Sequence, residues 1–339
     1  MHASLKDIAN ALNLSTTTVS WVLSGKSEEK GISPATRDRV KECARELNYR
    51  PNLLARSLHD GCSNTIGLIV PSIGDQFYSS MVRFIELEAE KFGYALMVCS
   101  SENDRERENN IVDILRAKQV DGLLMAPTKY SNEKVVSMME DNFPFVLFDR
   151  YFPELATNYV IIDNEISSYN LVKHLLEKCY NKIAVLTTNT HLYTMQLRYS
   201  GYCSAHEDMG VKPDERLYGE VDPKDYENSI ETVLDRIFHD VPDVDAFFFT
   251  THVLASRFFG YCTRKGINLD FGYACIHEEQ LFSILAPHMN VAQLPIASLG
   301  REAVRILLQD IKRLKIKKKK TDPPPKQGVI LSCSLEFRD

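Results

Sequence analysis

Two stretches decide how this chain folds: LKDIANALNLSTTTVSWVL at residues 5–23 and ISPATRDRVKECARELNYRPNLLARSL at residues 32–58. In the first stretch, apolar residues recur over residues 5–12 at the spacing of one helix face. Ser4 precedes them and Asp7 follows three positions later, which is the pattern of a capping box at a helix N-terminus. The first helix is therefore predicted to begin directly after Ser4.

Two further helix starts follow along the same segment. Ser15 is placed as the N-cap of a helix over residues 16–23, and Ser33-Pro34 marks a third start with proline at the first helical position. Asn13-Leu14 leaves only a tight connection between the first two helices. This arrangement predicts a helix-turn-helix, whose second helix enters the DNA major groove with its N-terminus first.

The second helix leaves polar side chains on its outer face, because Val19 and Val22 are predicted to face the first helix. Thr16 and Thr17 can exchange hydrogen bonds with base edges and touch thymine methyl groups. Ser15 and the helix N-terminus are placed to bind a backbone phosphate. The pattern alone leaves a second interpretation open, in which the three helices bind a protein instead of DNA.

Residues 50–58 are predicted to form one or two helical turns after Pro51. A segment this short cannot hold a helix alone in water, so it forms only when packed, for example against its twin on DNA. Leu54 and Leu58 form its apolar edge, and a leucine here could wedge between base pairs and kink the duplex. An ordinary linker with incidental leucines is the alternative.

After Gly61 strand and helix patterns alternate, which predicts two parallel, doubly wound α/β lobes with a ligand cleft beyond the carboxyl ends of their strands. The expected strands are 65–70, 95–99, 122–125, 145–148, 183–187 and 246–250. The expected helices are 78–92, 105–118, 132–141, 166–179, 195–209 and 225–239.

Composition limits the class of protein. The 339 residues are 44% hydrophobic and 25% charged, as in soluble globular proteins, and no apolar run approaches the length of a membrane span. Net charge is −6, but residues 1–63 carry nine Lys and Arg against seven Asp and Glu. A slightly basic head on an acidic body fits a small DNA-reading module on a larger domain. The start MHASLKDIAN does not resemble a signal peptide.

Neither metal nor catalytic motifs occur. Eight cysteines are scattered without a C-x-x-C pair, which favours reduced thiols in the cytoplasm, and no metal or other cofactor is expected. No G-x-G-x-x-G, P-loop, G-x-S-x-G or H-E-x-x-H is present. Asp149-Arg150, Asp163 and Glu165 could be acid–base groups, but polar contacts to a ligand or turn roles are favoured. No catalytic residue is therefore assigned.

The N-terminal segment resembles the DNA-binding head of the lactose-repressor (LacI/GalR) family. The resemblance rests on L-x-D-I-A-x-x-L-x-x-S-x-x-T-V-S-x-V-L, S-x-x-T-R-x-R-V, E-L-N-Y-R-P-N and A-R-S-L. It implies base reading by Thr16, Thr17 and Trp21, and a hinge helix whose Leu58 intercalates at the operator centre. The full implied DNA-binding set is Leu5, Ser15, Thr16, Thr17, Ser20, Trp21, Ser33, Thr36, Tyr49, Asn52, Ala55 and Leu58.

Two features of the head depart from the family pattern. Trp21 stands where arginine or histidine is more usual, and an indole cannot make the bidentate contact that arginine makes to guanine. The loop Ser24–Ile32 is longer than in the founding members. Because Glu28 and Glu29 would repel phosphate, we expect this loop to point away from DNA.

The body resembles the effector-binding core of the same family, shared with periplasmic sugar-binding proteins, through Ile66-Gly67-Leu68, Val120-Asp121-Gly122, Asp149-Arg150 and the closing Leu335-Glu336-Phe337-Arg338. The implied effector-binding residues are Ser72, Asp75, Phe77, Tyr78, Asp149, Arg198, His252 and His277.

Two departures affect the effector. His277 stands where the family usually carries an aspartate for ligand hydroxyls, and Thr251-His252 replaces the usual Asn-Asp. These changes favour an anionic or differently shaped ligand, or else a degraded site with little response.

The predicted organisation is a helix-turn-helix domain at 1–49, a hinge and linker at 50–63, and an effector-binding and dimerisation domain at 64–339. Its first lobe is expected at about 64–158 and 291–320, and its second at about 163–288 and 325–339.

The sequence thus predicts a cytoplasmic, nucleoid-associated repressor. It would bind a pseudo-palindromic operator as a homodimer and respond to a sugar, sugar derivative or nucleobase-like effector. The alternatives are a ligand-binding protein of the same core fold with little or no response, and an enzyme on this fold.

Overall fold

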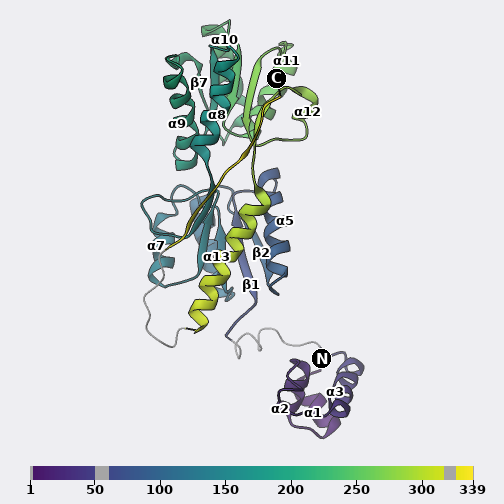
Figure 1. Cartoon of the computed structure of the whole chain (residues 1–339). Helices are drawn as coiled ribbons and strands as arrows, with labels where there is room; N and C mark the ends of the chain where they lie inside the picture. Colours follow the sequence, from purple (N-terminus) through teal and green to yellow (C-terminus); the bar gives the residue numbers. More distant parts are fainter. Residues whose placement is uncertain (1–2, 50–60, 317–325, 339) are drawn as a thin grey trace. The chain divides into compact units, whose positions relative to one another are not determined.

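The structure is a computed structural model that describes residues 3–49, 61–316 and 326–338 (Figure 1). The chain divides into two compact units, Met1–Ser63 and Asn64–Asp339, which are described separately. The hinge helix predicted over residues 50–58 lies outside the described residues. Within the described part of the chain, none of the helices has the length and apolar character needed to cross a membrane.

Residues 3–49, the part of the first unit that the structure describes before residue 61, contain three helices: α1 (Leu5–Leu12), α2 (Thr16–Leu23) and α3 (Pro34–Glu46). All three predicted N-caps are confirmed. Ser4 and Asp7 form the reciprocal capping box, with the Ser4 N–H donating to Asp7 Oδ2 at 2.8 Å. The Ser15 hydroxyl accepts the N–H of Thr18, and Ser33 accepts that of Thr36. Because these bonds satisfy amides that a helix end leaves open, local sequence is enough to place the helix starts.

A small core holds the three helices together. Ile8, Val19 and Val40 are completely buried, one from each helix. The helical spacing of Val40, Ala44 and Leu47 predicts all three in this core. For Leu47 that prediction is wrong, since its side chain is 39% exposed. The reason is that α3 ends at Glu46 and Leu47 leaves helical geometry at the C-cap, while Cys43 faces the core instead.

The first lobe of the second unit is a six-stranded parallel sheet with the order β11-β5-β4-β3-β1-β2. Its strands are β1 (Thr65–Val70), β2 (Ala95–Ser100), β3 (Gly122–Met125), β4 (Phe145–Phe148), β5 (Tyr159–Ile162) and β11 (Gly328–Leu331). Its helices are α5 (Gln76–Glu90), α6 (Arg105–Ala117), α7 (Asn132–Glu140) and α13 (Ile296–Ile316). Helices α5 and α13 cover one face of the sheet, and α6 and α7 cover the other. The central strands are therefore buried on both sides and read as continuous apolar runs.

The second lobe repeats this plan with the order β12-β10-β9-β8-β6-β7, in which β12 alone is antiparallel to its neighbour. Its strands are β6 (Ile183–Thr188), β7 (Tyr218–Val221), β8 (Ala246–Phe249), β9 (Gly272–Ile276), β10 (Asn290–Gln293) and β12 (Ser334–Glu336). Its helices are α8 (Asn164–Glu177), α9 (Tyr193–Asp208), the 3₁₀ turn η1 (Glu215–Leu217), α10 (Tyr226–Asp240), α11 (His252–Lys265) and α12 (Phe282–Leu285).

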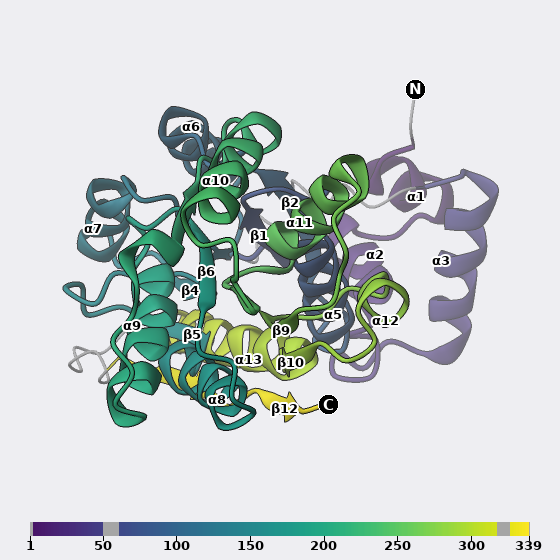
Figure 2. The same ribbon diagram turned by 90° about the horizontal axis from the view of Figure 1, so that it is seen from above.

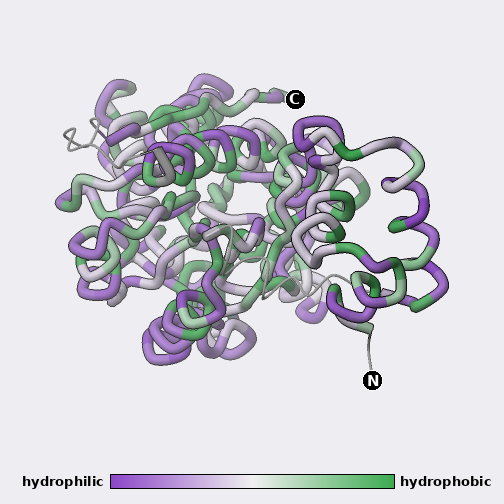
Figure 3. Tube along the Cα trace, turned by 90° about the horizontal axis from the view of Figure 1, so that it is seen from below, coloured by the Kyte–Doolittle hydropathy of each residue, from purple (hydrophilic) through white to green (hydrophobic). Residues whose placement is uncertain are grey.

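Helices α8 and α9 pack side by side on one face of the second sheet, as the view from above shows (Figure 2), and α10, α11 and α12 cover the other face. Hydrophobic and hydrophilic stretches alternate along single helices (Figure 3), as expected where one side of each helix meets a sheet. The predicted strands and helices between residues 65 and 250 are all present within two residues of their expected ends.

The predicted lobe boundaries need correction. Residues 159–162 form β5 of the first sheet, and residues 290–293 form β10 of the second. Residues 328–331 form β11 and return to the first sheet. The chain therefore passes from the first lobe to the second for the last time at Ser332-Cys333, instead of near residues 320–327. Sequence could not locate this crossing, because only two residues separate β11 from β12 and neither is glycine or proline.

Candidate DNA-reading helix and inter-lobe cavity

The outer face of α2 carries the residues predicted to read DNA. Thr16 and Thr17 are exposed at its first turn, and Ser20 and Trp21 are partly exposed further along. The Ser15 hydroxyl is engaged by the N–H of Thr18 at 3.0 Å and lies 2.8 Å from its hydroxyl. The first turn of α2 thus presents short hydroxyl side chains around a helix N-terminus that favours an anion.

The long loop Ser24–Ile32 is compact. The Ile32 N–H donates to the carbonyl of Ser27 at 2.8 Å, and the Lys26 N–H donates to that of Trp21 at 2.9 Å. These bonds bring Lys30 Nζ to 5.3 Å from the centre of the Trp21 ring, which is a cation–π contact. The expectation that the loop points away from DNA stays a prediction for Glu28 and Glu29. Its Lys30, however, lies beside a predicted reading residue.

The other predicted DNA-binding residues have mixed positions. Leu5 is partly buried against the core of the head, and Tyr49 packs there too, so burial raises the pKa of its phenol. Ser33 and Thr36 share a hydroxyl contact of 2.9 Å at the start of α3. The predicted residues Asn52, Ala55 and Leu58 lie outside the described residues.

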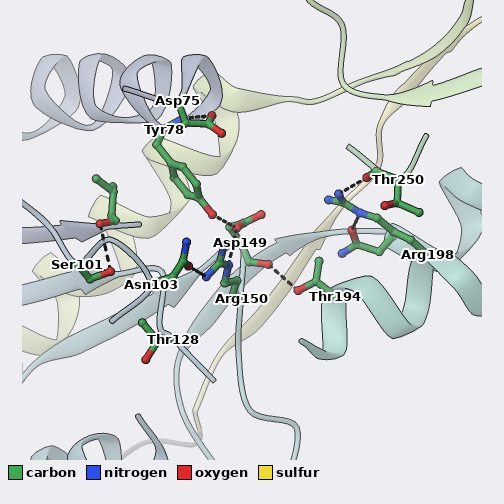
Figure 4. A network of polar contacts seen from close by, with 12 residues as sticks. Asp75, Tyr78, Ser101, Asn103, Thr128, Asp149, Arg150, Thr194, Arg198 and Thr250 are labelled. Carbon is green, nitrogen blue, oxygen red and sulfur yellow. Dashed lines mark hydrogen bonds and ion pairs between the residues drawn. The ribbon is translucent and has the colours of Figure 1, made fainter. Parts of the chain in front are cut away.

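In the second unit, all eight predicted effector-binding residues line one cavity of about 330 Å³ between the two lobes. They come from turns at the carboxyl ends of strands and from the first two turns of helices, the region where parallel sheets bind ligands. Figure 4 shows the polar network at this wall, with Tyr78, Asp149 and Arg150 on the first-lobe side and Thr194 and Arg198 on the second. Their role in binding remains a proposal.

The first-lobe wall is built on the start of α5. Asp75 caps this helix and accepts the N–H of Phe77 at 2.8 Å and that of Tyr78 at 3.4 Å. Tyr78 in turn donates its hydroxyl to Asp149 Oδ2 at 2.6 Å. Burial raises the pKa of Asp75, only partly offset by the two N–H donors, and burial also raises the pKa of Tyr78. This wall is therefore pre-arranged before any ligand enters.

Arg198 supplies the main charge of the second-lobe wall and is only 5% exposed. Its Nε donates to Asn164 Oδ1 at 2.8 Å, and its Nη1 donates to the Thr250 carbonyl at 2.6 Å. Burial lowers the pKa of Arg198, while the charge of Asp149 acts in the opposite direction. The guanidinium is thus held in one position at the edge of the cavity.

Two histidines lie beside this arginine. The rings of His252 and His277 meet edge to face, with centroids 4.9 Å apart. His252 Nε2 lies 3.5 Å from Glu279 Oε1 and 3.8 Å from Asp75 Oδ1. Burial lowers the pKa of each histidine to about 4, so both rings are uncharged near neutral pH.

The predicted effector-binding set leaves out several residues of the cavity lining, although Asp149-Arg150 was predicted as a polar contact to a ligand or a turn. Arg150 donates Nη1 to Asn103 Oδ1 at 2.7 Å and lies between two cavities, because it also lines a neighbouring space of about 310 Å³. Thr194 lines both cavities, and Tyr226 lines the first. Thr194 and Tyr226 occupy first turns of helices that follow strands of the second sheet, so their position was a usable signal.

A helix-turn-helix head together with a two-lobed α/β core around a cavity defines the class of DNA-binding regulators that carry a small-molecule-binding domain. The family model described as bacterial regulatory proteins, lacI family, matches residues 4–52. The model described as periplasmic binding proteins and sugar binding domain of LacI family matches residues 63–326. The chain belongs to the LacI family of transcriptional regulators, and it is not an enzyme.

Individual relatives agree with this assignment. The HTH-type transcriptional repressor PurR of Aliivibrio fischeri (strain ATCC 700601 / ES114) is 30% identical over 91% of this chain and 92% of its own length. The probable HTH-type transcriptional regulator EndR of Paenibacillus polymyxa is 26% identical over 92% of this chain and 91% of its own length.

Solved structures share the fold. The Lac repressor bound to ONPG in its repressed state matches with a TM-score of 0.83 and 22% identity, covering 100% of this chain and 99% of that one. The transcriptional regulator CelR in its cellobiose complex matches with a TM-score of 0.71 and 22% identity, covering 99% of both chains.

Proposed function

We propose that this protein is a homodimeric repressor that binds a pseudo-palindromic operator and is modulated by a small molecule in the inter-lobe cavity. The observation that carries the proposal is the outer face of α2, where Thr16 and Thr17 stand exposed at a capped helix N-terminus. Two such heads on a two-fold axis match two operator half-sites. An operator on the chromosome places the protein in the cytoplasm with the nucleoid.

Exposed apolar side chains support a second copy as partner. The edge strand β2 presents Met97 and Val98, 38% and 37% exposed, and the neighbouring helix α5 presents Leu87 at 46%. An open sheet edge with apolar side chains is a surface that proteins usually cover. Pairing through the first lobes would bring the segments before β1 of the two copies together.

The regulatory step is linkage between the cavity and the DNA. A ligand that binds one arrangement of the lobes more tightly than another shifts the population toward it, and operator affinity changes by the same coupling free energy. Thr194 and Arg198 of the second lobe face Tyr78 and Asp149 of the first across the cavity, so a ligand there contacts both lobes. The sign of the response depends on which arrangement binds DNA.

The test is selection of bound DNA from a random pool by the full-length protein. Wild type should enrich a site with two related half-sites, and Thr16→Ala with Thr17→Ala should abolish that enrichment. Thr16→Ser with Thr17→Ser is the matched control, because serine keeps the hydroxyls and loses the methyls that contact thymine. If wild type enriches no site although its core binds a ligand, a ligand-binding protein without DNA function is favoured. If the alanine variant selects the same DNA as wild type, Thr16 and Thr17 do not read it.

A further inference from the structure

Arg198 is a buried cation that has no ionic partner among the residues that the structure describes. Its two hydrogen-bond acceptors, Asn164 Oδ1 and the Thr250 carbonyl oxygen, are both neutral. Among the residues that the structure describes, no carboxylate oxygen lies within 4.0 Å of its guanidinium nitrogens. A buried charge without a counter-charge is costly, and nearby dipoles compensate it only in part.

The carboxylates that line the same cavity are already engaged elsewhere. Asp75 accepts two main-chain N–H groups at the start of α5. Asp149 accepts the Tyr78 hydroxyl and lies 3.6 Å from Arg150 Nε. The third arginine of the lining, Arg257, pairs with Glu227. Arg198 is therefore the arginine of this cavity that forms no ion pair with a carboxylate of the described residues.

The histidines do not supply the missing negative charge, and they do not compete for an anion as cations. Burial holds the pKa of both His252 and His277 at about 4, so each ring is a neutral donor or acceptor. His277 Nδ1 is buried without a hydrogen-bond partner among the described residues. The second-lobe wall thus presents the Arg198 guanidinium beside two neutral imidazole rings.

We propose that the ligand of the inter-lobe cavity is an anion whose carboxylate or phosphate pairs with Arg198. This inference rests on the proposed effector function and specifies the ligand of that same site. A planar guanidinium suits either group, because its N–H donors match two oxygens of one anion. The aromatic rings of Phe77 and Tyr226 line the same cavity, so the remainder of the ligand meets apolar faces.

The experiment uses inorganic phosphate and acetate as probes on the full-length protein. The thermal midpoint is measured against probe concentration, with sodium chloride at equal ionic strength as the reference. Phosphate also stabilises proteins by general exclusion from their surface, so the comparison that matters is between variants. Wild type should gain a saturable increase in midpoint with at least one probe, and Arg198→Gln should lose that saturable part.

Two further variants keep the test decisive. Arg257→Gln removes a cavity arginine that already has Glu227 as partner, so it should retain the saturable shift. Arg198→Lys keeps the charge without the fork and should retain a weaker shift, which covers the case in which Arg198→Gln folds poorly. The inference is overturned if the thermal midpoint shifts equally in wild type, Arg198→Gln and Arg198→Lys. It is also overturned if neither probe shifts the midpoint of wild type beyond the chloride reference.

The same samples separate this inference from the proposed function. Operator selection is run in chloride alone and again with each probe, so that it detects DNA binding whether the anion strengthens or weakens it. If the operator is bound and the anion shift is absent, the anionic ligand is wrong and the repressor remains. If the anion shift is present and no operator is found, the cavity chemistry stands and the DNA function fails.

Discussion

Thr194 donates its hydroxyl to the main-chain carbonyl oxygen of Asp149 across the lobe interface, with 3.1 Å between the two oxygens. Thr194 belongs to the first turn of α9 in the second lobe, and Asp149 directly follows β4 of the first. Asp149 has a left-handed backbone, with φ of 62°, and its carboxylate accepts the Tyr78 hydroxyl. One residue of the first lobe is thus bonded both within its own lobe and to the opposite one.

Thr194→Val should loosen this contact between the lobes. Valine has nearly the same shape, so the change removes the donor and leaves the Asp149 carbonyl without it. We expect a loss of about 1 kcal/mol in unfolding free energy, the usual net worth of such a hydrogen bond. Urea unfolding followed by circular dichroism measures this change in unfolding free energy. Thr194→Ser keeps the donor and should lose less, and a valine variant as stable as wild type would contradict the assignment.

Gly201→Ala should be one of the most damaging small substitutions in the core. A Cβ at this position of α9 would lie 2.3 Å from the Glu165 carbonyl oxygen and 2.8 Å from the Tyr169 nitrogen, both main-chain atoms of α8. Main chain cannot turn aside as a side chain can, so the helices must separate. We expect a loss of about 3 kcal/mol or more, at the upper end of overpacking costs.

Gly260→Ala is the matched control for this effect. Gly260 also lies inside a helix, α11, but a Cβ there would come no closer than 3.6 Å to the end of the Arg264 side chain. Alanine should then stabilise by about 0.5 to 1 kcal/mol, because it favours the helix more than glycine does. Thermal unfolding of both variants should show opposite signs.

Local signals explain what the sequence could predict. The caps at Ser4, Ser15 and Ser33 need only residues within three positions, so the helix starts of the head could be found without tertiary information. The strands of the core were visible because burial on both faces makes them continuous apolar runs, as in β6. Both signals are carried by neighbouring residues.

The remaining features depend on residues that are far apart in the chain. That Arg150 and Thr194 each line two neighbouring cavities is visible only when the two lobes are folded against each other. The return of residues 328–331 to the first sheet is set by pairing with β5, about 170 positions earlier, as in Val329 opposite Val160. The absence of an ionic partner for Arg198 is likewise a property of the packed cavity and of no local motif.

Stability should fall as the solution becomes acidic, because of His252 and His277. Their folded-state pKa values of about 4 lie below the usual value of about 6.5, so the unfolded chain binds protons first. The contribution of each histidine is fully present above about pH 6.5 and is lost as pH falls toward 4. Each can add a slope of up to about 1.4 kcal/mol per pH unit.

The double variant His252→Gln with His277→Asn should flatten this slope. Asparagine is chosen at position 277 because the backbone there is left-handed, with φ of 73°, and asparagine tolerates that conformation. The carboxylates of Asp75 and Glu279 face the pair and are shared by variant and wild type, so the difference between variant and wild type is the quantity to measure. His239→Gln, at a side chain 87% exposed, is the control. An unchanged slope in the double variant would remove the histidines as its cause.

Lys30 should contribute to DNA binding through its charge, because the loop Ser24–Ile32 holds it over Trp21 on the predicted reading helix. A phosphate contact releases a counterion, which steepens the fall of affinity with salt by about 0.9 for each contact in a log–log plot. With one Lys30 in each head of a dimer, Lys30→Gln should reduce that slope by about 2 and weaken binding to specific and unrelated DNA alike.

Lys30→Arg keeps the charge and its contact with the indole ring, so it should keep the slope. Trp21→Leu removes the ring that positions Lys30 and should shift base preference in the selected site as well as affinity. If Lys30→Gln keeps the wild-type salt dependence, the loop takes no part in the DNA contact and its lysine only packs on the tryptophan.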